Sequence, residues 1–143
     1  MRFYIATGLE NAERARQLSA VLTRNGHELT YDWTAHGDIR SQGEAKMAEV
    51  AFNEVRSVRD AELFVALIPG GAGTHTELGA VIASRSNKRI LVWSETGIEF
   101  QPDKNSCTFY FHPCVERICC PFDELIKRLD ADRIDSMSSF GQN

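Results

Sequence analysis

A carboxylate that follows a glycine-rich stretch is the feature of this sequence with the clearest chemical potential. Residues 70–79 read Gly-Gly-Ala-Gly-Thr-His-Thr-Glu-Leu-Gly, so Glu77 stands shortly after three glycines. Glycine lets the backbone pass close to a ligand because it carries no side chain. A carboxylate beside such a loop can attack a sugar carbon or stabilise an oxocarbenium-like transition state, as in glycoside chemistry. We therefore expect Glu77 to act as a catalytic carboxylate in a glycine-walled cleft.

Two other interpretations fit the same stretch. Thr74 and Glu77 have the spacing of a capping box, in which both side chains only satisfy backbone N–H groups at the start of a helix. A glycine loop before a helix can also bind phosphate through free N–H groups and the helix dipole. No P-loop lysine follows, however, and neither residues 70–73 nor the residues after Ala6 form the G-x-G-x-x-G fingerprint. Nucleoside triphosphate and NAD sites are therefore disfavoured.

The elements around this loop indicate where the cleft lies. Residues 63–68 are six unbroken apolar residues, typical of a parallel strand covered on both faces. Thr74 is the expected cap of a helix that continues through Leu78, Val81 and Ile82, which places Glu77 in the first turn. There the positive helix end should keep the carboxylate ionised. The cleft should therefore open at the carboxyl end of a buried parallel strand.

The rest of the chain alternates between strand and helix patterns. Strands are expected at residues 2–6, 29–33, 63–68, 89–93 and 115–120, and helices at 11–25, 43–60, 74–86 and 121–130. The apolar face expected for the helix at 43–60 consists of Met47, Val50, Ala51, Val55 and Val58. This order predicts one α/β domain over residues 1–130, doubly wound around a central, mostly parallel five-stranded sheet of the Rossmann or flavodoxin type. Residues 131–143 are predicted to form a polar, frayed C-terminal tail.

Composition limits the partners and the compartment. The 143 residues carry a net charge of -4, which argues against a nucleic acid polymer as partner. No long apolar run and no signal-peptide pattern is present, so we expect no membrane partner and a cytoplasmic location. The four cysteines fit no common zinc spacing and are expected to be reduced: Cys107, Cys114, Cys119 and Cys120. We predict no metal site, and the sequence implies no organic cofactor.

The glycine stretch also resembles the motif of a known enzyme family. Ala61-Glu62, an apolar strand and then Pro-Gly-Gly-x-Gly-Thr-x-x-Glu-Leu-Gly resemble the nucleoside 2-deoxyribosyltransferase family, which includes 2′-deoxynucleoside 5′-phosphate N-hydrolase-like proteins. The opening strand and the order of elements to about Trp93 are similar as well, which is roughly two thirds of the chain. The resemblance implies an enzyme that cleaves or transfers the N-glycosidic bond of a (deoxy)nucleoside or its 5′-monophosphate. It also implies a covalent glycosyl ester on the motif glutamate.

The family's functional residues can be matched to positions in this sequence. The nucleophile matches Glu77, and the tyrosine that helps to hold it matches Tyr4 on the first strand. A family aspartate that handles the base or a sugar hydroxyl matches Glu54, with Asn53 and Asp60 as alternatives if the alignment shifts. Members of the family complete their sites with a neighbouring chain, so the resemblance implies a homo-oligomer.

Further residues are expected to contact the substrate because they lie in the loops after the strands. At the end of the second strand, Trp33 is placed to stack on a base and Asp32 to bond its edge, while His75 follows the expected helix cap. His36 and His112 are loop residues with no evident partner. The predicted substrate contacts are Thr7, Gly8, Asp32, Trp33, Gly70, Gly71, Gly73, Thr74 and His75.

Two alternative functions remain open. Gly71 stands where the family often has Asp or Ser, which favours a non-catalytic nucleotide-binding or sensing module of the same fold. The motif also resembles the phosphoribohydrolases that release cytokinin bases from nucleoside monophosphates. Those proteins carry another glycine motif near the first helix, which residues 7–10 do not reproduce.

Overall fold

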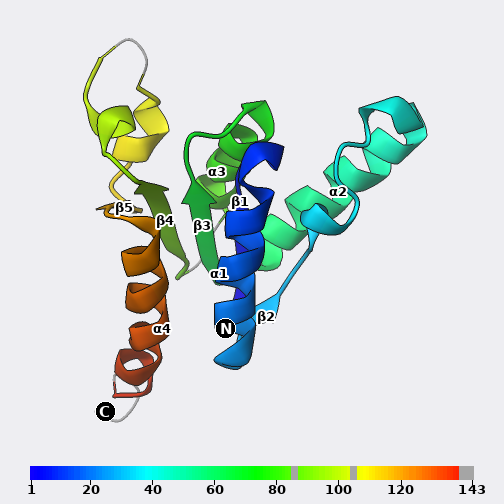
Figure 1. Cartoon of the computed structure of the whole chain (residues 1–143). Coiled ribbons are helices and arrows are strands. Elements are labelled where there is room, and N and C mark those ends of the chain that lie inside the picture. The colour runs from blue at the N-terminus through cyan, green and yellow to red at the C-terminus, as the bar shows by residue number, and fades with distance from the viewer. Residues whose placement is uncertain (85–86, 104–105, 139–143) are drawn as a thin grey trace.

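Five parallel strands form the centre of the computed structural model, which describes residues 1–84, 87–103 and 106–138 (Figure 1). They are β1 (Arg2–Ala6), β2 (Glu28–Leu29), β3 (Leu63–Leu67), β4 (Arg89–Ser94) and β5 (Val115–Cys119), in the order β2-β1-β3-β4-β5. Each neighbouring pair is parallel. This order is that of a flavodoxin-like sheet. The predicted fold class is confirmed.

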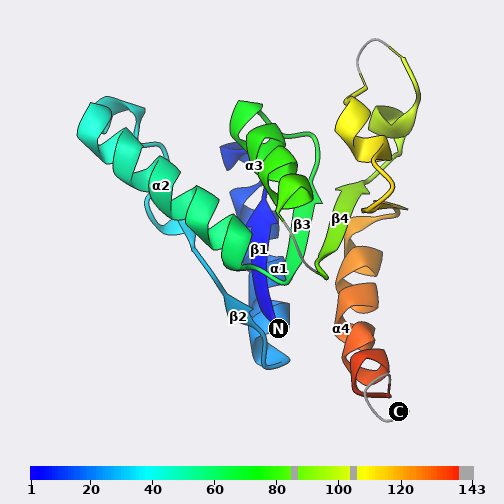
Figure 2. The same ribbon diagram turned by 180° about the vertical axis from the view of Figure 1, so that it is seen from behind.

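Helices cover both faces of this sheet. They are α1 (Ala12–Arg24), α2 (Glu44–Asp60), α3 (Ala72–Ala83) and α4 (Phe122–Ser138). The two opposite views show α1 and α4 on one face and α2 and α3 on the other (Figures 1 and 2). None of the described helices is long and apolar enough to cross a membrane.

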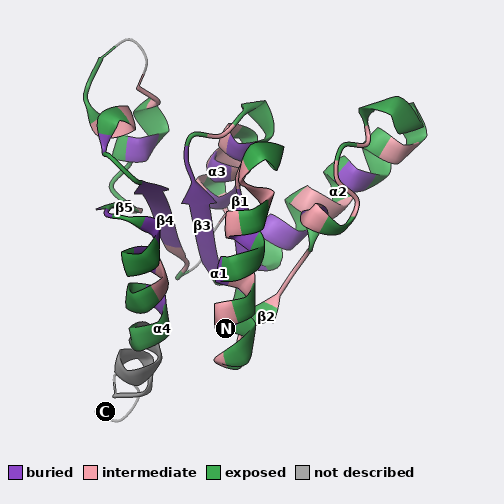
Figure 3. Cartoon of the chain, in the orientation of Figure 1, coloured by how far each residue is buried: buried purple, intermediate pink, exposed green. Residues whose placement is uncertain are grey.

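The three central strands form the middle of the core, and β3 and β4 are almost wholly buried (Figure 3). Every residue of β3 is buried, as the unbroken apolar run predicts for a strand with helices on both sides. Large side chains from β1 and β4, such as Phe3 and Trp93, fill the space between the sheet and its helices. The loops that leave β1 and β3 are therefore anchored to a close-packed base.

The predicted apolar face of α2 is only partly correct. Val50 and Val58 are buried, but Met47 and Val55 are 44% and 50% exposed, and Ala51 is exposed too. The physical reason is that α2 meets the rest of the molecule along a narrow stripe on α3 and β1, while its amino-terminal half projects away from the sheet (Figures 1 and 2). Met47 and Ala51 are left free to line a cleft instead.

Three elements differ from the sequence expectation by more than one residue at a boundary. The second strand ends at Leu29, and Trp33 begins the short 3-10 helix η2 (Trp33–Ala35), because the Asp32 side chain caps this turn through the Thr34 N–H. Helix α3 begins at Ala72 with Gly71 as its N-cap, so Thr74 is not the cap. Helix α4 continues to Ser138, past the predicted end at residue 130, and residues 139–143 of the predicted tail lie outside the described residues.

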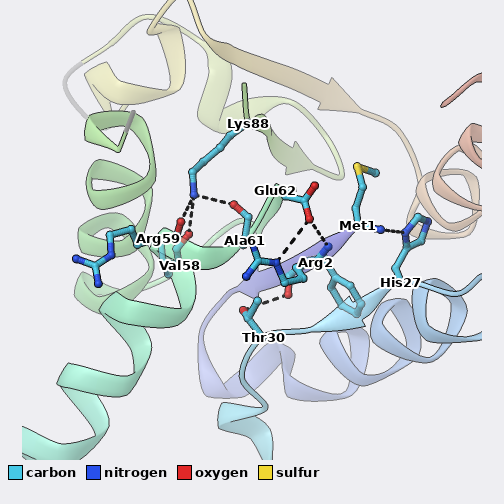
Figure 4. A network of polar contacts seen from close by, with 10 residues as sticks. Met1, Arg2, His27, Thr30, Val58, Arg59, Ala61, Glu62 and Lys88 are labelled. Carbon is cyan, nitrogen blue, oxygen red and sulfur yellow. Dashed lines mark hydrogen bonds and ion pairs between the residues drawn. The ribbon is translucent and has the colours of Figure 1, made fainter. Parts of the chain in front are cut away.

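Polar contacts tie together the edge of the sheet where the strands begin (Figure 4). The Lys88 ammonium donates to the carbonyl oxygens of Ala61 at 2.7 Å and of Arg59, at the carboxyl end of α2. The Arg2 backbone N–H donates to Glu62 Oε1 at 3.1 Å, and the Met1 amino group lies 3.1 Å from His27 Nδ1. These contacts fix the start of β1, β3 and β4 relative to the end of α2.

Candidate active site

A cleft of about 790 Å³ opens at the opposite edge, where β1 and β3 end. The chain leaves β1 toward β2 on one side and leaves β3 toward β4 on the other, so the two loops diverge. Ligands of doubly wound proteins bind at this kind of switch point. The walls come from the loop after β1, residues 36–40, α2, and the glycine loop that leads into α3.

Glu77 lies in the second turn of α3 and faces this cleft. Its Oε2 is buried and has no hydrogen-bond partner within the described structure. Burial raises the pKa of Glu77 to about 8, with a smaller contribution in the same direction from Glu54 and an opposing one from Tyr4. The expectation of an ionised carboxylate in the first turn is therefore wrong. Because α3 begins at Ala72, Glu77 lies beyond the free N–H groups of the helix end, and desolvation outweighs the dipole.

Tyr4 lies beside Glu77 under the cleft. Its side chain is fully buried, and its ring is parallel to that of Phe64 with 6.1 Å between centroids. Burial, and then the Glu77 carboxyl, raise the pKa of Tyr4 far above its usual value. The two groups interact electrostatically, yet no hydrogen bond of standard geometry is formed, and the Tyr4 hydroxyl is buried without a partner in the part of the chain described. A phenol that stays protonated at this point can donate to a carboxylate or to a ligand.

Glu54 is the acidic residue that α2 contributes. It is half-buried and lines the cleft, whereas the alternatives Asn53 and Asp60 do not. Burial raises the pKa of Glu54, and the nearby His36 opposes this shift. Two carboxyl groups with raised pKa values thus share one cleft, which is the usual arrangement of acid–base chemistry.

Most of the other predicted substrate contacts meet at the cleft, and two do not. Asp32 borders a separate cavity of about 310 Å³ between α1 and β2, because its carboxylate is turned to cap η2. His75 also lies outside the cleft lining: its Nδ1 is 2.7 Å from the Gly71 carbonyl oxygen and its Nε2 is 2.5 Å from the Tyr110 hydroxyl. The predicted contacts that do line the cleft are Thr7, Gly8, Trp33, Gly70, Gly71, Gly73 and Thr74.

Internal hydrogen bonds occupy two of these lining side chains. The Thr7 hydroxyl donates to the Leu67 carbonyl oxygen at 2.6 Å, and the Trp33 indole N–H donates to that of Ile5 at 2.7 Å. Both bonds hold the loops after the strands against the sheet. Each side chain therefore shapes the wall of the cleft, and Trp33 offers a ligand its ring rather than its N–H group.

The glycine loop contains one close-packed position and one open position. A methyl group on Gly70 would lie 2.6 Å from Thr74 Oγ1, whereas one on Gly71 would meet nothing within 4 Å. The Thr74 side chain is buried against Gly70, which explains why it does not cap the helix. Glycine is therefore needed at position 70 for packing against Thr74, whereas the loop has room for a side chain at Gly71.

His36 is a lining residue that sequence reasoning did not select. Its Nδ1 is 2.8 Å from the Gly37 carbonyl oxygen, which can only accept, so Nδ1 carries a hydrogen. Its Nε2 is buried without a hydrogen-bond partner within the described ranges. No motif marks this histidine, because only the path of the loop before α2 brings it next to Glu54.

Among the described residues, no group of three His, Cys, Asp or Glu side chains is arranged to hold a metal ion. No protein-family model and no curated protein matches the chain. Among solved structures, the chain is similar to the CMP N-glycosidase BcmB of Clostridium botulinum, with a TM-score of 0.63 and 18% identity over 91% of this chain and 99% of that one. At this identity the similarity shows a shared fold, the doubly wound sheet described above.

Proposed function

We propose that this protein is an enzyme that cleaves or transfers the N-glycosidic bond of a (deoxy)nucleoside or its 5′-monophosphate. The supporting observation is that Glu77 Oε2 and the Tyr4 hydroxyl, both buried without a hydrogen-bond partner in the described structure, lie together beneath a glycine-walled cleft. Buried polar groups that lack partners cost stability, so a ligand that satisfies them accounts for their presence here. The similar solved structure is a CMP N-glycosidase, which by its name breaks a bond of this kind.

The proposed chemistry begins with the deprotonated Glu77 carboxylate. It attacks the anomeric carbon, a C–O bond forms, and the C–N bond breaks with its electron pair going to the base. Glu54, which is half-buried and has a raised pKa, supplies a proton to the departing base. The Tyr4 hydroxyl orients the attacking carboxylate. Water or a second base then attacks the glycosyl ester, which releases Glu77 for another cycle.

We further propose that a second copy of the chain completes the cleft. The projecting half of α2 carries exposed apolar side chains, including Met47 and Phe52, which are 44% and 67% exposed. Met47 borders the cleft itself, so a neighbour that covers α2 would also narrow the opening. Light scattering at several protein concentrations tests this proposal. A monomer at all concentrations contradicts it, and dissociation by Phe52→Asp supports it.

A panel of nucleosides and monophosphates tests the proposed reaction. We expect the wild type to release free base, detected by chromatography, and a quenched reaction to show a glycosyl adduct on Glu77 by mass spectrometry. Glu77→Gln should reduce turnover by at least about 1,000-fold, because the amide is a poor nucleophile. The control is Glu124→Gln, which removes an exposed carboxylate of α4 that pairs with Arg128.

The outcomes separate the candidate functions. Base release that survives in Glu77→Gln contradicts the nucleophile assignment. Binding without base release from any substrate contradicts the enzyme and favours the non-catalytic module. Release from ribonucleoside monophosphates alone favours the phosphoribohydrolase. Adding a second free base to the reaction distinguishes transfer from hydrolysis, because only a transferase forms the new nucleoside.

A further inference from the structure

Acidic side chains outnumber lysine and arginine in the lining of the cleft. Four lining residues are acidic: Glu10, Asp38, Glu54 and Glu77. Arg40 is the only Lys or Arg in the lining, all of which belongs to the described part of the chain. Burial raises the pKa of Glu54 and Glu77, so the charged carboxylates that a phosphate dianion meets are those of Glu10 and Asp38, beside the one guanidinium.

The guanidinium of Arg40 is already engaged. Its Nε lies 2.9 Å from Asp38 Oδ1, its Nη2 lies 3.0 Å from Asp38 Oδ2, and its backbone N–H donates to Oδ1 at 3.0 Å. This fork is the geometry with which arginine holds a phosphate. The same contacts lower the pKa of Asp38, so the carboxylate stays charged beside the guanidinium. To bind a phosphate through Nε and Nη2, Arg40 would first have to release Asp38.

The loop after β1 brings a second carboxylate to the place where the strands diverge. A methyl group on Gly8 would collide with the Glu10 carboxyl group, so this carboxyl lies directly over the backbone of Gly8. Gly8 and Glu10 both line the cleft. A phosphate that approached this backbone would meet a like charge, whereas a sugar hydroxyl could donate a hydrogen bond to it.

The amino end of α3 opposes the negative charge of the acidic lining residues. Its helix dipole amounts to roughly half a positive charge, and its first residues also line the cleft. That partial charge does not offset the full negative charge of Glu10, and Arg40 is already paired with Asp38. The balance of charge around the cleft thus favours an uncharged ligand.

We propose that the cleft selects nucleosides that carry no 5′-phosphate, on the basis of Glu10 over Gly8 and the closed Arg40–Asp38 pair. This inference rests on the proposed N-glycosidic chemistry and names its substrate class. It separates this protein from the similar solved structure, which is named for its action on CMP.

Matched pairs of substrates test the inference. Base release is measured with cytidine against CMP and with each other nucleoside against its 5′-monophosphate, at constant ionic strength. We expect kcat/KM to favour the nucleoside by at least about tenfold, since repulsion between a dianion and two exposed carboxylates is of this order. Preference for the monophosphate overturns the inference. If neither substrate releases base, the proposed function fails, and the ratio of dissociation constants from calorimetry decides the inference instead.

Two isosteric variants test whether Glu10 and Asp38 cause the preference for nucleosides without a 5′-phosphate. Each variant should reduce the ratio of kcat/KM for the nucleoside to kcat/KM for the monophosphate several-fold. Glu10→Gln removes a repulsive charge, and Asp38→Asn frees the Arg40 guanidinium. The control is Glu13→Gln, which removes an exposed carboxylate of α1 that pairs with Arg16 and lies outside the cleft lining. A ratio that is unchanged in both variants, or that shifts equally in Glu13→Gln, overturns the assignment to these residues.

Discussion

The two edges of the sheet differ in the buried polar groups that they leave without hydrogen-bond partners. At the edge where the strands begin, the Lys88 ammonium and the Arg2 N–H group find carbonyl or carboxylate oxygens (Figure 4). At the edge where the strands end, the Tyr4 hydroxyl, Glu77 Oε2 and His36 Nε2 are buried with no hydrogen-bond partner among the described residues. Both edges belong to the same strands, so the difference does not come from a difference in fold.

The contrast indicates which edge stabilises the protein and which edge serves a ligand. A buried polar group left without a partner costs about 1–3 kcal/mol, whereas a satisfied group is neutral or stabilising. Substitutions that remove polar atoms at the edge where the strands begin (the amino edge) should therefore lower the free energy of unfolding. Substitutions at the edge where the strands end (the carboxyl edge) should leave it unchanged or raise it. The following predictions test this contrast, from the largest expected effect to the smallest.

The largest effect is expected from Glu77→Gln as the pH changes. The pKa of Glu77 in the folded protein, about 8, lies above the ordinary glutamate value of 4.5, so the protonated carboxyl contributes its full stability below pH 4.5 and loses it as the pH rises to about 8. The variant lacks this loss, so its stability relative to wild type should rise between these pH values, by up to about 1.4 kcal/mol per pH unit. Denaturant unfolding at pH 5, 6, 7 and 8 measures the slope.

Activity should also depend on pH over this range. Because Glu77 must be ionised and Glu54 protonated, kcat/KM of the wild type should follow a bell-shaped pH profile, with one limb set by the Glu77 pKa of about 8. A stability difference that does not depend on pH would show that Glu77 does not hold the proton assigned to it.

The second prediction concerns the glycine wall of the cleft. Gly70→Ala should destabilise the protein by about 1–3 kcal/mol, because the new methyl group would overlap the buried Thr74 side chain. Gly71→Ala is the matched control and should change stability by less than about 0.5 kcal/mol, because its methyl group meets open space. Thermal unfolding of both variants measures the difference. Equal destabilisation of the two would refute the close packing described at Gly70.

At the opposite edge, Lys88→Met should remove the hydrogen bonds to the last carbonyl groups of α2. We expect a loss of about 1–2 kcal/mol, because these acceptors are left without their charged donor. Lys127→Met, at an exposed position of α4, is the control and should lie within about 0.5 kcal/mol of wild type. If both lysines behave alike in urea unfolding, the amino edge does not owe its stability to this cap.

The smallest change is expected from Tyr4→Phe, which removes only a hydroxyl that has no partner in the described structure. Stability should stay the same or rise by up to about 1 kcal/mol, since no hydrogen bond is lost. Base release should nevertheless fall by about tenfold to a hundredfold if the hydroxyl orients Glu77. A clear loss of stability would show that this hydroxyl is satisfied in the folded protein and would weaken the contrast between the edges.

The amino-acid sequence by itself determined the fold class and the place of the cleft. The unbroken apolar run of β3 and the alternation of strand and helix patterns require a parallel sheet with both faces covered. The glycines after β3 then mark the carboxyl end of a central strand. These are local properties of composition and periodicity, which do not depend on contacts between residues distant in sequence.

Only the tertiary structure decided what each residue does in the cleft. Thr74 has the spacing of a cap but is buried against Gly70, so α3 begins at Ala72 and Glu77 lies beyond the helix end. His36, with no motif around it, reaches Glu54, because the chain folds back over α2. Protonation and side-chain direction depend on burial and on neighbours distant in sequence, which no local pattern records.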